Sequence, residues 1–155
     1  MDPRIREHAE IIVDHSIDLQ PDDNVVISTP GVAEDLAVAV HEAVGDRGAT
    51  PVHLADDSRA TRAYLRSADA DSFETPTHVK ALYEESDVLI RVRAEANATE
   101  QSDIAPEKQA AHSRARQPVQ EVALSKRWCL TQFPSQGNAQ LAGMSTEAYE
   151  NFVWD

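Results

Sequence analysis

Short apolar runs rich in β-branched residues alternate along this chain with stretches of helical periodicity. Of all features of the sequence, this alternation restricts the possible fold classes most strongly. Such a run is typical of a buried strand, and apolar residues every three or four positions are typical of a helix packed on a sheet. The predicted strands are residues 24–28, 51–55, 87–93 and 128–133. Because strands separated by helices pair in parallel through right-handed crossovers, we predict a three-layer α/β fold, with a mostly parallel sheet of about four strands flanked by helices.

The predicted helices begin behind residues that cap helices well. Asp2 precedes a helix that starts at Pro3, and Ser145 precedes one that reaches Trp154. Short polar side chains at these positions accept hydrogen bonds from the first free N–H groups. A helix starting at Pro106 contains Pro118, which is expected to kink or restart it. The other predicted helices are residues 32–44, 59–67 and 78–85, and the polar stretch 94–105 is predicted as a loop.

Acidic residues outnumber basic ones by 27 to 14, which gives a formal net charge of −13. A field of this sign repels phosphate backbones and anionic lipids, so neither nucleic acid nor a membrane is an expected partner. The acids are spread along the chain, and only three of the basic residues are lysines. This pattern is typical of a salt-adapted, halophilic protein whose self-repulsion is screened by concentrated salt. The alternative is an acidic protein without such adaptation.

The expected location is the cytoplasm. The sequence contains no run of about 18 apolar residues that would span a membrane, and its first residues lack the apolar segment of a secretory signal. The single cysteine, Cys129, fits a reducing compartment because it has no partner for an internal disulfide. A length of 155 residues fits one domain.

The six histidines are the natural candidates for metal ligands, but their spacing along the chain does not favour a site. His41-Glu42 begins like the zinc-protease motif, which needs a second histidine one turn later, where this chain has Gly45. His8 and His15 are seven residues apart. Two helical turns separate such residues by about 10 Å, which is too far for one ion.

The best cluster is His53 with Asp56 and Asp57, because ligand crevices form at the carboxyl ends of parallel strands. A partly exposed strand histidine followed by a helix-capping aspartate explains the same residues without a metal. We therefore expect no metal ligand in this chain.

Catalytic and phosphate-binding patterns are absent or incomplete. Residues 28–31, Ser-Thr-Pro-Gly, join a strand to a helix, where backbone N–H groups can hold an anion. The glycine-rich phosphate patterns are missing, and Glu34 already places negative charge there. Cys129 lies within an apolar strand, which is typical of a core thiol, and Arg91 and Arg93 alternate with apolar residues and could face a carboxylate. No catalytic residue is predicted, and the sequence does not assign substrate-binding residues.

The last third of the chain resembles the thermophilic metallo-aminopeptidase family, the aminopeptidase T and aminopeptidase S group. The similarity is strongest at residues 127–134 (Arg-Trp-Cys-Leu-Thr-Gln-Phe-Pro) and 139–153 (Ala-Gln-Leu-Ala-Gly-Met-Ser-Thr-Glu-Ala-Tyr-Glu-Asn-Phe-Val). Residues 87–93, Asn97 and residues 103–108 also resemble the family. Its members usually carry threonine after the proline, where this chain has Ser135, which keeps the hydroxyl. The similarity spans essentially the whole chain, weakly before residue 80.

The resemblance implies that residues 1–155 are the N-terminal α/β domain of a two-domain cytoplasmic aminopeptidase. Such an enzyme hydrolyses N-terminal residues from peptides, usually as a homodimer, with two divalent metal ions such as zinc, cobalt or manganese. The family's metal-binding residues lie in a second domain that is absent from this chain. The chain is therefore expected to be a truncated domain that binds no cofactor itself and is inactive alone. The alternative is a stand-alone α/β binding or interaction module without catalytic activity.

The apolar end of the chain also carries an expectation. A final helix that reaches Phe152, Val153 and Trp154 is expected to leave some apolar surface without partners. Helical spacing puts Tyr149, Phe152 and Val153 on one face, so Trp154 is expected to be the side chain left over.

Overall fold

The four predicted strands form one sheet. The computed structural model describes residues 1–155, and its strands are β1 (Asn24–Pro30), β2 (Thr50–Asp56), β3 (Val88–Arg93) and β4 (Arg127–Gln132). Their order is β2-β1-β3-β4, and every neighbouring pair is parallel. This confirms the predicted α/β class, and each strand ends within two residues of its predicted bounds.

Seven α-helices connect and flank these strands. They are α1 (Pro3–Ile11), α2 (Glu34–Asp46), α3 (Ser58–Ser67), α4 (Thr77–Glu84), α5 (Pro106–Leu124), α6 (Gln136–Leu141) and α7 (Thr146–Trp154). The predicted caps form: Asp2 accepts from the backbone N–H of Arg4 at 2.9 Å, and Ser145 accepts from that of Ala148 at 3.2 Å. None of the helices combines the length and apolar character needed to cross a lipid bilayer.

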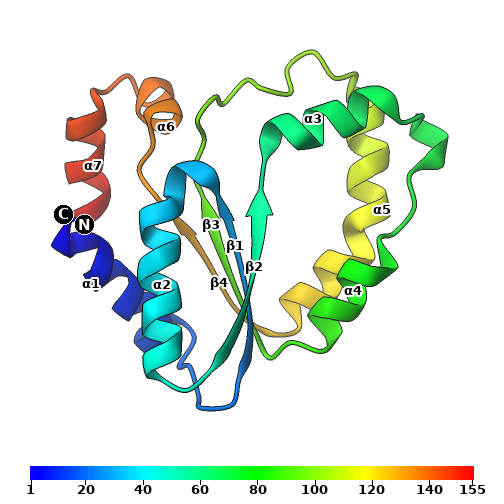
Figure 1. The fold of residues 1–155 in the computed structure, drawn as a ribbon. Helices are drawn as coiled ribbons and strands as arrows, with labels where there is room; N and C mark the ends of the chain where they lie inside the picture. The colour runs from blue at the N-terminus through cyan, green and yellow to red at the C-terminus, as the bar shows by residue number, and fades with distance from the viewer.

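The helices cover the two faces of the sheet unequally (Figure 1). On one face, α1 and α2 pack with alternate residues of β1 and β3 into a core of 19 buried apolar side chains. The other side is occupied by α3, α4 and α5, of which α4 and α5 pack against each other. The connections between β1 and β2 and between β3 and β4 thus use opposite faces, which gives the predicted three layers.

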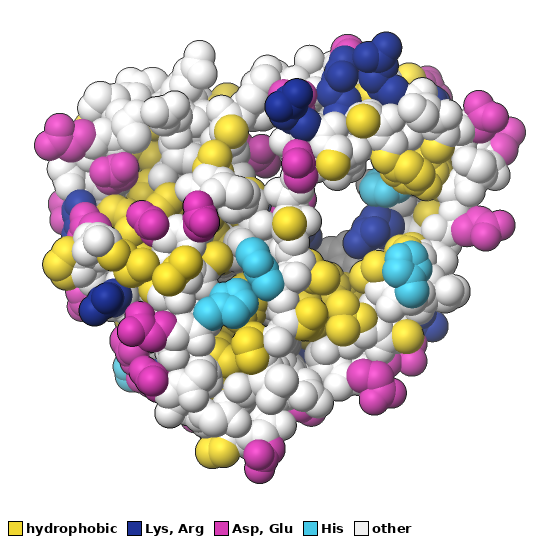
Figure 2. Space-filling view, viewed as in Figure 1, with side chains coloured by type: hydrophobic (Ala, Val, Ile, Leu, Met, Phe, Trp, Pro, Cys, Tyr) yellow, Lys and Arg dark blue, Asp and Glu magenta, His cyan; other side chains and the backbone are white.

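The face of the sheet toward α3, α4 and α5 stays partly open. Parallel sheets are usually covered by helices on both faces, yet Trp128 is 50% exposed, Leu130 43% and Val52 39%. Figure 2 shows an opening on this side, between the sheet and the helices α3 and α5. Water therefore reaches one face of the sheet, while the other face is buried by α1 and α2.

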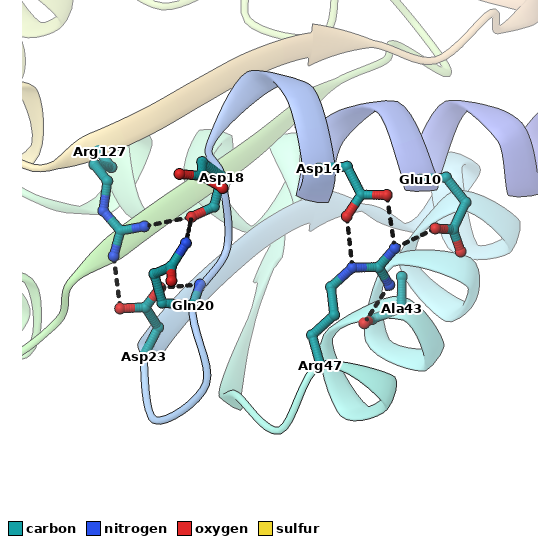
Figure 3. Close-up of polar contacts among 8 residues, drawn as sticks. All are labelled: Glu10, Asp14, Asp18, Gln20, Asp23, Ala43, Arg47 and Arg127. Atoms are coloured by element: carbon teal, nitrogen blue, oxygen red, sulfur yellow. Dashed lines mark hydrogen bonds and ion pairs between the residues drawn. The ribbon is translucent and has the colours of Figure 1, made fainter.

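Two arginines tie the N-terminal segment to the rest of the molecule (Figure 3). Arg127, at the start of β4, donates to Asp23 at 2.6 Å, and Asp23 is almost buried. Arg47, just after α2, donates to Asp14 at 2.8 Å and also pairs with Glu10. Both clusters therefore connect α1 and the turn that follows it to the rest of the fold.

Helix α6 is not among the helices that the sequence predicts. Ser135 caps α6 by accepting from the N–H of Asn138 at 3.3 Å, and Gly137 lies against the backbone of Glu95.

Of the two outcomes predicted for Pro118, a kink or a restart of the helix, the restart does not occur. Helix α5 is unbroken from Pro106 to Leu124. Figure 1 shows the C-terminal part of α5 changing direction toward the sheet. Val119, next to the proline, is buried.

The prediction for the C-terminus is wrong in its choice of residue. Trp154 packs on the core and against Phe133, with ring centroids 5.8 Å apart, and the Arg4 guanidinium lies 4.8 Å above its ring. Phe152, 72% exposed, is the side chain left in solvent, although its ring lies beside that of Tyr149. The two termini lie together (Figure 1), so α1 covers Trp154, a contact that spacing within α7 cannot reveal.

Candidate functional site

A cavity of about 630 Å³ opens beside the carboxyl ends of β1 and β2. Its walls are the ends of these strands, the turn that leaves β1, and one side of α2. The polar side chains that line it are Thr29, Glu34, His41 and His53. In Figure 2 two histidines lie side by side over α2 and β2, where this cavity opens.

One helix face and one strand pairing bring these residues together. Glu34 and His41 are seven residues apart and lie on the same side of α2. In the sheet, His53 is paired with Ile27, two residues before Thr29. Since alternate residues of a strand share a face, His53 and Thr29 both point toward α2.

Each imidazole in the cavity makes one close hydrogen bond. His53 Nε2 lies 2.7 Å from Thr29 Oγ1, and His41 Nδ1 donates to the carbonyl oxygen of Ala37 at 2.7 Å. The two rings lie edge to face with centroids 5.2 Å apart. Burial, and then the nearby His41, lower the pKa of His53, since both disfavour a second positive charge there. Protonation of His53 is thus disfavoured in this cavity.

The structure separates the sequence-based cluster of His53, Asp56 and Asp57. Asp57 caps α3 by accepting from the N–H groups of Arg59 and Ala60. Asp56 lies near Arg91, with its oxygen 3.8 Å from the guanidinium nitrogen, on the face of the sheet opposite to His53. The cluster does not form, because alternation along β2 sends neighbouring positions to different faces.

His8 and Cys129 lie apart from this cavity, whereas the predicted turn at residues 28–31 contributes to it. His8 binds Thr131 of β4 through Nε2 at 2.7 Å, and burial lowers its pKa. Cys129 packs against the core, where burial raises the pKa of its thiol, as expected for a core thiol rather than a nucleophile. Of the turn at residues 28–31, Thr29, Pro30 and Gly31 line the cavity.

No group of three or more His, Cys, Asp or Glu side chains within residues 1–155 is arranged to hold a metal ion. A two-metal hydrolytic centre requires bridging carboxylates and several further ligands around ions about 3.5–4 Å apart. The residues of this chain therefore do not fit such a centre.

Comparison with known proteins connects this fold to one family. The family model described as thermophilic metalloprotease (M29) matches residues 1–155, the whole chain. No curated protein matches the chain significantly. The solved structure of wild-type AmpT from Thermus thermophilus shares the fold, with a TM-score of 0.78 over 97% of this chain at 19% sequence identity. The match covers 41% of the AmpT chain, so this chain spans less than half of that protein. On the family match over its full length, the chain belongs to the thermophilic metalloprotease family.

Proposed function

We propose that residues 1–155 form the N-terminal α/β domain of a cytoplasmic metallo-aminopeptidase that hydrolyses N-terminal residues from peptides. The observation that carries this proposal is the match of the metalloprotease family model to all 155 residues. The fold shared with AmpT from Thermus thermophilus agrees with it.

In this proposal the catalytic metal site lies outside residues 1–155, and the chain alone is inactive. Two observations support this: AmpT is more than twice as long as this chain, and no cluster of three or more metal-ligating side chains is present here. The full-length enzyme would hold two divalent ions (zinc, cobalt or manganese) and act on peptides as a homodimer, without nucleic acid or membrane partners.

A stand-alone α/β binding module is the second candidate. The open face of the sheet favours it, since Trp128, Leu130 and Val52 are all more than a third exposed on that face. Exposed apolar surface of this kind typically marks an interaction site.

Hydrolysis of aminoacyl p-nitroanilides distinguishes the two candidates. The purified chain of residues 1–155 and the complete product of its gene are assayed with zinc, cobalt or manganese in concentrated salt. We expect release of p-nitroaniline by the complete product only. Hydrolysis by residues 1–155 alone would contradict the assignment of the metal site to another region. A gene that encodes these residues and nothing more, or a complete product without activity, favours the binding module.

A further inference from the structure

We propose that His41 and His53 form a binding site for one transition-metal ion of the copper or zinc class, in the cavity between α2 and β2. Neutral imidazole is a preferred ligand of these ions, whereas magnesium and calcium prefer oxygen. This proposal does not depend on the aminopeptidase function proposed above, because it uses only side chains of residues 1–155.

The separation of the two rings fits a shared ion. A Zn–N bond of about 2.0–2.1 Å and a ring radius of about 1.1 Å place each ring centroid about 3.2 Å from the metal. Two such rings at a tetrahedral angle hold their centroids about 5 Å apart. The observed separation of His41 and His53 is 5.2 Å. Both residues line the same cavity of about 630 Å³, which leaves room for the ion and its water ligands.

The hydrogen bonds on the two rings leave a nitrogen of each available. Histidines that bind metals usually donate the N–H of the other ring nitrogen to a carbonyl or another oxygen, which fixes the tautomer and the ring orientation. His41 Nδ1 donates to the carbonyl oxygen of Ala37, so its Nε2 keeps the lone pair. When His53 Nε2 donates to Thr29 Oγ1, its Nδ1 keeps the lone pair. Thr29 itself is buried, which holds this partner in place.

Electrostatics favours a cation here. Glu34 lines the cavity, and the chain as a whole carries a charge of −13. An excess of negative charge raises the local concentration of cations. Because no third His, Cys, Asp or Glu side chain completes a cluster, water or a small ligand would fill the remaining coordination positions.

Calorimetric titration of the untagged chain with CuCl₂ and ZnCl₂ tests this site, with 0.5 M KCl present to screen diffuse binding. We expect one Cu²⁺ per chain, tighter binding of Cu²⁺ than of Zn²⁺ by the order of divalent metal affinities, and no matching site for Mg²⁺. The variants His41→Gln and His53→Gln should each weaken Cu²⁺ binding by about tenfold or more. Thr29→Val, which removes the partner of His53, should weaken it by about tenfold.

His78→Gln is the matched control, because His78 is an exposed histidine on α4 outside the cavity. It should bind Cu²⁺ like the wild type. In the unsubstituted chain, substoichiometric Cu²⁺ should broaden the ring-proton NMR signals of His41 and His53 before those of the other four histidines. The proposal is overturned if no stoichiometric site is found, if His41→Gln or His53→Gln leaves binding unchanged, or if other histidines broaden first.

Discussion

His8 links two elements through one partly buried side chain. From α1 its Nε2 reaches Thr131 Oγ1 in β4 at 2.7 Å, while its Nδ1 is buried without a hydrogen-bond partner. A proton on that nitrogen would find no acceptor, and burial lowers the pKa of His8. The buried position of His8 thus makes the stability of the fold sensitive to pH.

The direction of this pH dependence follows from proton binding. An unfolded histidine takes up a proton near pH 6.5, whereas His8 in the folded protein does so only at lower pH. As the pH falls below about 6.5, the unfolded state binds more protons, and the folded state loses stability. Glutamine cannot titrate, so in His8→Gln the free energy of unfolding should fall less steeply between about pH 7 and pH 5. Urea unfolding across this range checks the slope.

The control for that measurement is His78→Gln, which removes an exposed histidine on α4. Equal slopes for His8→Gln and the wild type would show that burial of His8 does not contribute to acid destabilisation.

At the scale of elements, two glycines in helices have opposite roles. Gly45 lies near the end of α2, and a Cβ added there meets nothing within 4 Å. Gly137 lies in the first turn of α6, where a Cβ would overlap the carbonyl oxygen of Glu95. The neighbour is backbone, which cannot rotate away. Gly137 is therefore required by the close approach of α6 to the segment after β3, whereas Gly45 is not required by packing.

Alanine at each glycine should change stability in opposite directions. Gly45→Ala should raise the free energy of unfolding by about 0.5–1 kcal/mol, because alanine favours a helix over glycine. Gly137→Ala should lower it by about 1–3 kcal/mol or more, because an inserted methyl group overpacks the site. Urea unfolding measures both variants against the wild type. A stable Gly137→Ala protein would mean that α6 moves away from Glu95 at little cost.

The strands were predictable and α6 was not, for physical reasons. Residues 24–28 and 87–93 are apolar and β-branched, so their local sequence already favours buried strands. By contrast, α6 has only six residues, including Gly137 and Asn138, and its helical propensity is low. It forms because Ser135 caps it and because Ser135 and Asn138 hold the backbone N–H of Glu95, at 3.1 and 3.0 Å. The contacts with Glu95 are tertiary and have no local signal in the sequence.

The sequence predicts some residues of the candidate site but not which of them lie together. The turn after the first strand and His53 were both recognised, but His53 was grouped with Asp56 and Asp57, its neighbours along the chain. Its partners in the structure are Thr29 and His41. Finding them requires the pairing of β1 with β2 and the helix face that packs above it. Strand order is a property of the whole sheet, and spacing along one segment does not contain it.

At the scale of the whole molecule, charge is divided between two regions. Ten of the fourteen lysines and arginines lie between residues 58 and 126, the part that contains α3, α4 and α5. The first 57 residues, which contain α1, α2, β1 and β2, hold thirteen acids and three basic residues. Repulsion between like charges is therefore concentrated in the first 57 residues, which also supply most of the buried core.

This division predicts that salt stabilises the fold, as proposed for a halophilic protein. The Debye length shrinks from about 10 Å at 0.1 M to about 3 Å at 1 M salt, so KCl weakens repulsion among acids that lie near each other on α1 and α2. The ion pairs of Arg47 with Asp14 and of Arg62 with Asp103 are also screened, but surface pairs contribute little. We therefore expect the midpoint of thermal unfolding to rise with KCl concentration.

The shape of the salt dependence identifies its cause. Screening is nearly complete by 1 M, so most of the rise should occur between 0.1 and 1 M KCl and less between 1 and 3 M. A midpoint that rises evenly up to 3 M would indicate a general effect of salt on burial of apolar surface. A flat or falling midpoint would mean that the acidic composition has no role in salt adaptation.

Replacing Glu7 and Glu10 on α1 by glutamine should raise the midpoint at 0.1 M KCl and reduce its further gain in salt, because two charges of the acidic region are then removed. The pair of Glu10 with Arg47 is lost in that variant, so Glu7→Gln alone separates the loss of repulsion from the loss of the ion pair.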